Sequence, residues 1–199
     1  MSTLKVDTIL KRTGTGTITL GQSGDTIAMP AATLTTALPV AQGGTGSTTL
    51  AGAGLANTPN CLVYLSGSQT ITDDSITKIT FDTEVYDSDS AFASNKFTVP
   101  SGAAGKYAIL FNLSLDTQAD SNMNYAYGYI YKNGSSIRQA GIDFRGNAGR
   151  RNFVSVFSVE DLAVSDYIEA YAIADDTSGS PIVTGGSANS LFMIWKLIG

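Results

Sequence analysis

Residues 97–116 read FTVPSGAAGKYAILFNLSLD, and the second half of this stretch decides the fold of the chain. From Tyr107 to Leu115 the odd positions are apolar, whereas Asn112, Ser114 and Asp116 are polar. A period of two places one face of an extended strand in a core. We therefore predict a long core strand that begins near Tyr107.

A corner precedes this strand. Pro100 has no N–H group to donate to a neighbouring strand, and Gly102 and Gly105 allow the chain to turn back. The sequence therefore predicts a short strand that ends near Val99, then a turn, then the long strand.

A hairpin signal follows at residues 129–137, which read YIYKNGSSI. An Asn-Gly pair at positions 133 and 134 is typical of a two-residue type I′ turn between antiparallel strands. The tyrosines before the turn alternate and so share one face of the first strand; they are Tyr125, Tyr127, Tyr129 and Tyr131.

The order of these elements resembles the C1q/TNF-like jelly roll, in which a phenylalanine strand, a proline corner, an aromatic strand and an Asn-Gly hairpin follow one another. The resemblance covers residues 61–199 and implies an all-β, jelly-roll sandwich head that is trimeric. Where the family usually has Gly-Asp, this chain has Ser165-Asp166. Glycine does not recur at every third residue, so the collagen stalk of animal C1q proteins is missing. This departure points away from animal secreted proteins and towards phage.

Two strands are apolar on both faces. In NFVSVFSV, from residue 152, Phe153 and Phe157 occupy one face and Val154 and Val156 the other, and residues 191–198 read LFMIWKLI. A lone sandwich solvates its outer faces, so these strands predict burial against other copies of the chain in a homotrimer. The residues expected in the core or trimer interface are Tyr125, Tyr127, Tyr129, Phe153, Phe157, Phe192 and Trp195. For the tyrosines, the stacking of sugars remains an alternative.

Composition supports one β-rich domain with an extension. The chain has 199 residues, of which 43% are hydrophobic and only 15% charged, and it contains 21 glycines. The net charge of −5 argues against a nucleic-acid partner held by phosphate contacts. No run approaches the roughly 18 apolar residues of a membrane span, and the N-terminus lacks the apolar region of a signal peptide. We expect synthesis in the host cytoplasm and no insertion into a membrane.

The residue types also exclude several chemistries. The absence of histidine excludes Ser-His-Asp and Cys-His catalysis and His-ligated zinc. Cys61 is the only cysteine and cannot form an internal disulfide, so we expect it to act as a small buried hydrophobic residue.

Residues 1–30 read MSTLKVDTILKRTGTGTITLGQSGDTIAMP and contain two short alternating runs. This opening resembles the attachment end of many phage fibre and appendage proteins, particularly those of marine phages. The resemblance implies a virion anchor that contacts other virion proteins through Leu4, Val6, Ile18 and Leu20. The alternative is a flexible arm.

Residues 31–60 are rich in Gly, Ala and Thr and contain LPVAQGGTGSTTLAGA from position 38. The pattern resembles an element of phage tail-fibre shafts, and small residues suit a narrow three-chain axis. A plain glycine-rich linker is the alternative. A nucleotide-binding loop is excluded because no Lys-Ser/Thr pair follows the glycines.

The leading functional hypothesis is a homotrimeric phage fibre, located in the virion, whose C-terminal head contacts a glycan or protein on the host surface. The second is a trimeric capsid decoration or head-fibre protein without a receptor. Loops carry binding more often than strands do. The candidate receptor contacts are Ser88, Asp89, Gln118, Asp120, Asn122, Arg150, Arg151, Asp175 and Asp176.

A third hypothesis, a depolymerase, needs two carboxylates that flank a sugar bond. Asp87 with Asp89 and Asp175 with Asp176 are close pairs in Ser- and Gly-rich loops, which is more typical of solvated turns, so we expect no enzyme and no cofactor. Calcium at a loop cluster that includes Asp116 and Asp120 is the one alternative for a bound ion.

Overall fold

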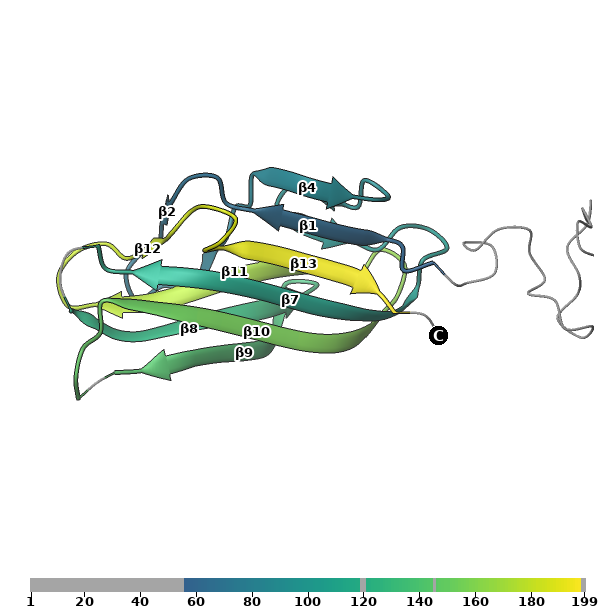
Figure 1. Cartoon of the computed structure of the whole chain (residues 1–199). Coiled ribbons are helices and arrows are strands. Elements are labelled where there is room, and N and C mark those ends of the chain that lie inside the picture. Colours follow the sequence, from purple (N-terminus) through teal and green to yellow (C-terminus); the bar gives the residue numbers. More distant parts are fainter. Residues whose placement is uncertain (1–55, 119–120, 145, 198–199) are drawn as a thin grey trace, which may run out of the picture.

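The structure, a computed structural model, describes residues 56–118, 121–144 and 146–197 (Figure 1). Within these ranges the regular elements are thirteen strands in two antiparallel sheets. The seven-stranded sheet contains β1 (Asn60–Tyr64), β2 (Gln69–Thr70), β4 (Thr83–Asp87), β7 (Gly105–Asp116), β10 (Arg151–Leu162), β12 (Ile182–Val183) and β13 (Leu191–Lys196). The six-stranded sheet contains β3 (Thr77–Lys78), β5 (Phe92–Ala93), β6 (Lys96–Thr98), β8 (Met123–Lys132), β9 (Ser135–Asp143) and β11 (Tyr167–Asp176). The all-β prediction is confirmed.

Strand β7 organises the seven-stranded sheet. It pairs with β10 along its whole length on one side and with β13 and then β12 on the other, and β1 and β4 extend the sheet beyond β13. The six-stranded sheet runs β5-β6-β11-β8-β9, with β3 also paired to β11. The chain crosses between the sheets from β7 to β8, from β9 to β10 and from β10 to β11, and the sheets form two packed layers (Figure 1).

The predicted core strand is confirmed. The odd positions from Tyr107 to Leu115 are all completely buried. The corner is confirmed as well, because β7 follows the turn at Gly102, whose φ of +76° favours glycine. Unexpectedly, Ser114 and Asp116 on the opposite face of β7 are also buried, and Asp116 forms ion pairs there.

The Asn-Gly hairpin has the predicted turn. Asn133 and Gly134 both have positive φ, +52° and +79°, as a type I′ turn requires, and Lys132 pairs with Ser135 across it. The Asn133 side chain also accepts a hydrogen bond from the Tyr167 N–H group at 2.9 Å, which ties the turn to the start of β11.

The core lies between the two sheets and is aromatic at its centre. The Phe192 ring lies 5.9 Å from that of Phe81 and 6.0 Å from that of Phe92, measured between centroids. Cys61 is buried, as predicted, and burial, followed by the charges of Asp87 and Glu84, raises the pKa of its thiol to about 12.

Three of the residues predicted for the core or the trimer interface are not fully buried within the single chain. Phe153 and Phe157 are 61% and 57% exposed, because only the other face of β10 points into the core. Trp195 is only partly buried, because Phe192 and Ile194 take the inward positions of β13.

Several predicted positions lie outside the described residues. They are the proposed anchor residues Leu4, Val6, Ile18 and Leu20, the shaft pattern at 38–53, and Asp120.

Candidate functional site

The outer face of the seven-stranded sheet carries a row of apolar side chains across five strands. Leu62 of β1 pairs with Tyr86 of β4 and with Met193 of β13. Leu110 of β7 then pairs with Met193 and with Phe157 of β10. Residues directly opposite one another in an antiparallel sheet share a face, so these five side chains form one continuous apolar row.

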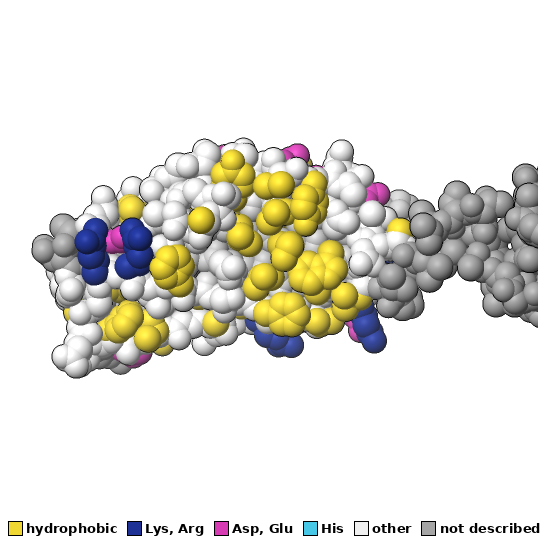
Figure 2. Space-filling model, in the orientation of Figure 1, with side chains coloured by type: hydrophobic (Ala, Val, Ile, Leu, Met, Phe, Trp, Pro, Cys, Tyr) yellow, Lys and Arg dark blue, Asp and Glu magenta, His cyan; other side chains and the backbone are white. Residues whose placement is uncertain are grey.

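The neighbouring positions extend the row into a wider surface. Trp195, Ala108 and Val159 pair in the same way one step along the strands, and Phe153 lies beyond Phe157 on β10. We call the whole set the apolar face; it comprises Leu62, Tyr86, Ala108, Leu110, Phe153, Phe157, Val159, Met193 and Trp195. Figure 2 shows hydrophobic side chains gathered over this side of the molecule.

Charged pairs bound the apolar face at both ends of β7 and β10. Asp116 pairs with Arg151 at one end, and Lys106 pairs with Asp161 at the other. An apolar centre with a polar rim is the usual anatomy of a protein–protein interface. Contiguous apolar surface of this kind is rarely left uncovered on soluble proteins. The arrangement therefore suits contact with another protein surface.

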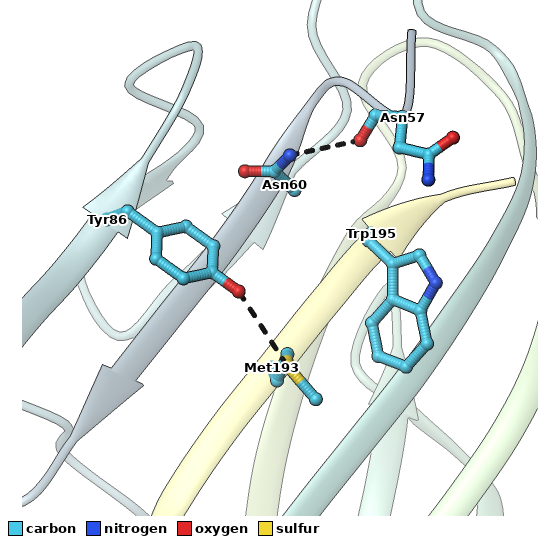
Figure 3. A pocket seen from close by; sticks show the side chains of 5 residues that line it. All are labelled: Asn57, Asn60, Tyr86, Met193 and Trp195. Atoms are coloured by element: carbon cyan, nitrogen blue, oxygen red, sulfur yellow. Dashed lines mark hydrogen bonds between the residues drawn. The ribbon is translucent and has the colours of Figure 1, made fainter. Parts of the chain in front are cut away.

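A shallow pocket of about 410 Å³ opens within the apolar face (Figure 3). Asn57, Asn60, Tyr86, Met193 and Trp195 line it. The Asn60 side-chain amide donates to the Asn57 carbonyl at 3.1 Å, and the Tyr86 hydroxyl lies 3.8 Å from the Met193 sulfur. The Trp195 indole lies on the other side of Met193 from Tyr86 (Figure 3). An apolar side chain of a partner protein could fill this pocket.

Asp116 centres a polar cluster at the end of the sandwich. Its Oδ2 accepts from Arg151 Nε at 2.6 Å, its Oδ1 accepts from the Gln118 N–H group at 2.6 Å, and Arg150 Nε lies 3.6 Å from Oδ1. Burial alone raises the pKa of Asp116, but these hydrogen bonds and the two guanidinium charges together lower it. Figure 2 shows an acidic side chain between two basic ones at this end.

The structure brings most of the predicted contact loops together at this end. Asn122 donates to the Ser178 carbonyl and hydroxyl, and Asp176 Oδ1 accepts from the Ser178 N–H group at 3.0 Å. Gln118 reaches the Ser180 carbonyl at 3.3 Å. The loops that carry Gln118, Asn122, Arg150, Arg151, Asp175 and Asp176 thus form one surface, which we call the loop end.

Ser88 and Asp89 lie at the opposite end of the sandwich. The Ser88 hydroxyl accepts from the Asn60 N–H group at 2.9 Å, next to the point where the described chain enters β1. Both Asp87 carboxylate oxygens accept backbone N–H groups, from Ala91 at 3.0 Å and Phe92 at 2.8 Å. Asp87 therefore closes a turn, and Ser88 and Asp89 cannot join the loop end.

The described residues contain no group of three or more His, Cys, Asp or Glu side chains that could hold a metal ion. At the loop end, Asp175 Oδ2 accepts from Asn124 at 3.0 Å, while Asp176 Oδ2 is buried and has no hydrogen-bond partner. The two side chains follow one another on β11 and point to opposite faces. This arrangement does not provide the facing carboxylates that glycoside hydrolysis needs.

The predicted interface tyrosines lie elsewhere. Tyr125, Tyr127 and Tyr129 are partly exposed on the outer face of the six-stranded sheet, on the opposite side of the sandwich from the apolar face. They are therefore neither core residues nor neighbours of Phe153 and Phe157.

Sequence reasoning missed Leu62, Tyr86, Leu110, Val159 and Met193, which complete the apolar face. The strand β13 gave a partial signal, because it is apolar at nearly every position. No local signal could identify Tyr86, because its place in the row depends on pairing between β4 and β1.

No protein-family model and no curated protein sequence matches the chain. Solved structures do match it. The Eiger TNF of S. frugiperda aligns with a TM-score of 0.54 at 11% identity, over 71% of this chain and 94% of that chain. The globular domain of zebrafish complement 1qA protein aligns with a TM-score of 0.51 at 13% identity, over 70% and 98%. Murine APRIL aligns with a TM-score of 0.51 at 12% identity, over 69% and 99%.

These similarities establish the fold, a C1q/TNF-like jelly roll. In the part of the chain that the structure describes, no helix has the length and apolar character to cross a membrane.

Proposed function

We propose that the chain is a homotrimeric structural protein of a phage virion, a fibre whose C-terminal head recognises the host surface. The observation that carries the trimer is the apolar face, in which Phe153 and Phe157 are more than half exposed in the single chain. Covering such side chains removes apolar surface from water and stabilises the assembly. The C1q/TNF-like fold supports a threefold arrangement, as the sequence resemblance implies.

The virion role rests on the first 60 residues. Residues 1–30 resemble phage attachment ends, and the element at 38–53 resembles fibre shafts. In this proposal residues 1–30 bind other virion proteins, residues 31–60 form the shaft, and residues 61–199 form the head. The trimer is assembled in the host cytoplasm and becomes part of the particle.

The loop end supports surface recognition. It holds two partly exposed arginines, Arg150 and Arg151, with side chains 56% and 43% exposed, beside polar loops. Loops held by a rigid sandwich tolerate sequence change and commonly carry binding. The two guanidinium groups, paired with Asp116, place exposed positive charge on the surface of a chain whose net charge is −5.

Two measurements test the proposal. Sedimentation of the full chain at micromolar concentration should give the mass of a trimer, and a stable monomer would refute the assembly. An antibody against the head should label particles that carry the chain, and excess free protein should slow their adsorption to host cells. Labelled particles without competition for adsorption would favour the capsid decoration role over host recognition.

A further inference from the structure

The outer face of the six-stranded sheet is built mainly from tyrosine. Alternation along β8 places four tyrosines on this face, and the register places Tyr171 of β11 directly opposite Tyr129. Six of the nine tyrosines of the chain lie here. We call this surface the tyrosine face; it comprises Tyr125, Tyr127, Tyr129, Tyr131, Tyr167 and Tyr171.

The rings form a row, which we call the platform, in which the planes of the neighbouring pairs are inclined to one another by 35° to 76°. The Tyr131 and Tyr171 centroids are 4.2 Å apart, those of Tyr129 and Tyr131 6.4 Å, and those of Tyr125 and Tyr127 5.8 Å. All of these residues are partly exposed. With a rise of about 3.3 Å per residue, the platform extends about 20 Å along β8 from Tyr125 to Tyr131. This length exceeds that of a single sugar ring.

Gly141 of β9 leaves room for one of the rings. It lies opposite Tyr127, and a Cβ atom at position 141 would lie 2.3 Å from Tyr127 Cδ1 and 2.6 Å from Cγ. The Tyr127 ring therefore rests on the backbone of β9, in space that any larger residue would fill. Tyr127 remains partly exposed.

Polar side chains flank the platform. Asp175, Gln139 and Glu169 lie opposite Tyr125, Tyr129 and Tyr131 respectively. The Tyr125 hydroxyl donates to Asp74, and the Tyr171 hydroxyl lies 3.4 Å from Glu169 Oε2. Gln139 and Asp175 therefore offer hydrogen-bonding groups beside the rings, whereas Glu169 is largely buried and bonded to Lys78.

The charges on this face select against anionic ligands. Its ammonium groups are already engaged, since Lys78 Nζ lies 2.6 Å from Glu169 Oε1 and Lys96 Nζ lies 4.5 Å from the Tyr167 ring centroid. Glu169 is neutralised by Lys78, so Asp74 and Asp175 leave the surface acidic around Tyr125. A sialylated, sulfated or uronic-acid glycan would be repelled.

We propose that the tyrosine face binds a neutral oligosaccharide, laid along β8. A pyranose ring has a face of C–H groups, which stacks on an aromatic ring, and a rim of hydroxyls, which bond to carboxylate and amide groups. The tyrosine face is less suited than the apolar face to contact with a second copy of the chain. The apolar face consists mainly of aliphatic and phenylalanine side chains and carries almost no charge, as a protein interface usually does. The inference deepens the proposed host recognition and rests on it for its biological setting.

The test uses the full-length protein and an array of neutral oligosaccharides of glucose, galactose, mannose, rhamnose and N-acetylhexosamines, with sialylated and uronic-acid glycans on the same array. The strongest neutral glycan is then titrated by calorimetry. Tyr127→Ala and Tyr129→Ala should each weaken binding about tenfold, which corresponds to about 1.4 kcal/mol. Tyr129→Phe keeps the ring and should retain most of the affinity. Val164→Ala, at an exposed position in the turn between β10 and β11, is the matched control.

The outcomes separate this inference from the proposed function. If wild-type protein competes for host cells and the two alanine variants compete equally well, host recognition stands and the tyrosine face is not the site. If neutral glycans bind but the protein does not compete for cells, the tyrosine face stands and host recognition falls. Binding to anionic glycans only, or to no glycan, would overturn the inference. The inference would also be overturned if the protein still competed for host cells whose glycans had been oxidised with periodate, but no longer competed for cells treated with protease. That result would identify the receptor as a protein.

Discussion

The two outer faces of this sandwich differ in chemistry although both belong to antiparallel sheets packed on one core. The apolar face presents Phe, Trp, Met, Leu and Val across five strands of the seven-stranded sheet. The tyrosine face presents rings that carry hydroxyls and lie beside carboxylates. The first combination favours burial against protein, whereas the second favours a ligand that is itself both apolar and hydroxylated.

The comparison shows that the outward-facing side chains of each sheet determine what that face can bind. The inward positions of β7 and of β8 are alike, since Phe111, Leu113, Ala126 and Ile130 are all completely buried. They stabilise the sandwich and leave the outward positions free to vary. The difference between the faces can therefore be tested by changing one residue on each.

The largest effect is expected from Phe157→Arg, at the β10 end of the apolar row. In the proposed trimer this change puts an unpaired charge into a desolvated interface in every subunit, at a cost of several kcal/mol per site. Sedimentation velocity at micromolar concentration should show monomers. Tyr129→Arg is the matched change on the tyrosine face and should leave the trimer intact. Equal loss of the trimer in both variants would mean that the two faces do not divide the roles.

The next effect compares two phenylalanines of one sheet. Phe192→Ala should destabilise the fold by about 3–5 kcal/mol, because the ring is buried against Phe81 and Phe92. Phe153→Ala should have little effect on the stability of the isolated chain, because the ring is 61% exposed. Urea unfolding of both variants in a monomeric Phe157→Arg background separates folding from assembly. Similar losses would show that Phe153 contributes to the core.

Much of the fold could be predicted from local patterns. Alternation identified β7, the positive φ of an Asn-Gly turn could be inferred from its residue types, and the buried Cys61 followed from chemistry. The very short strands, such as β2 and β12, could not be predicted, because two residues carry no period.

The site was harder to predict than the fold. Phe153 and Phe157 could be assigned to a surface that needs covering, but the burial of one face of β10 by its own chain could not be distinguished from burial by a partner. The tyrosines were grouped correctly on one face, yet the sequence could not tell to which sheet that face belongs. Ser88 and Asp89 were grouped with the loop end because the sequence does not show at which end of the sandwich a loop lies.

A smaller effect is expected at the rim of the apolar face. Arg151→Ala removes two close contacts of buried Asp116, at 2.6 Å and 2.5 Å, and should destabilise the chain by about 1–2 kcal/mol. Arg150→Ala, at 3.6 Å, should cost less than about 0.5 kcal/mol.

Because the pKa of Asp116 is lowered on folding, its stabilisation is present above pH about 4 and is lost as the pH falls further. Arg151→Ala should flatten this acid dependence, as measured by chemical unfolding at several pH values. An unchanged acid dependence would show that Asp116 does not depend on Arg151.

The smallest effect concerns the hydroxyls of the tyrosine face. The pKa of Tyr125 is raised, first by its hydrogen bond to Asp74 and then by burial, and burial is the first cause of the raised pKa of Tyr129 and Tyr171. A raised folded pKa means that the stabilisation is complete below the ordinary tyrosine pKa of about 10 and is lost as the pH rises through the folded value. Tyrosinate absorbance should therefore show these groups ionising above pH about 10, and glycan binding should stay constant up to that pH. Asp74→Asn should lower the pKa of Tyr125 and leave the trimer unaffected, because Asp74 lies on the side of the sandwich away from the apolar face. Ionisation of Tyr125 at the ordinary tyrosine pH would mean that its hydroxyl is not held by Asp74, and this hydrogen bond could not help to orient a bound glycan.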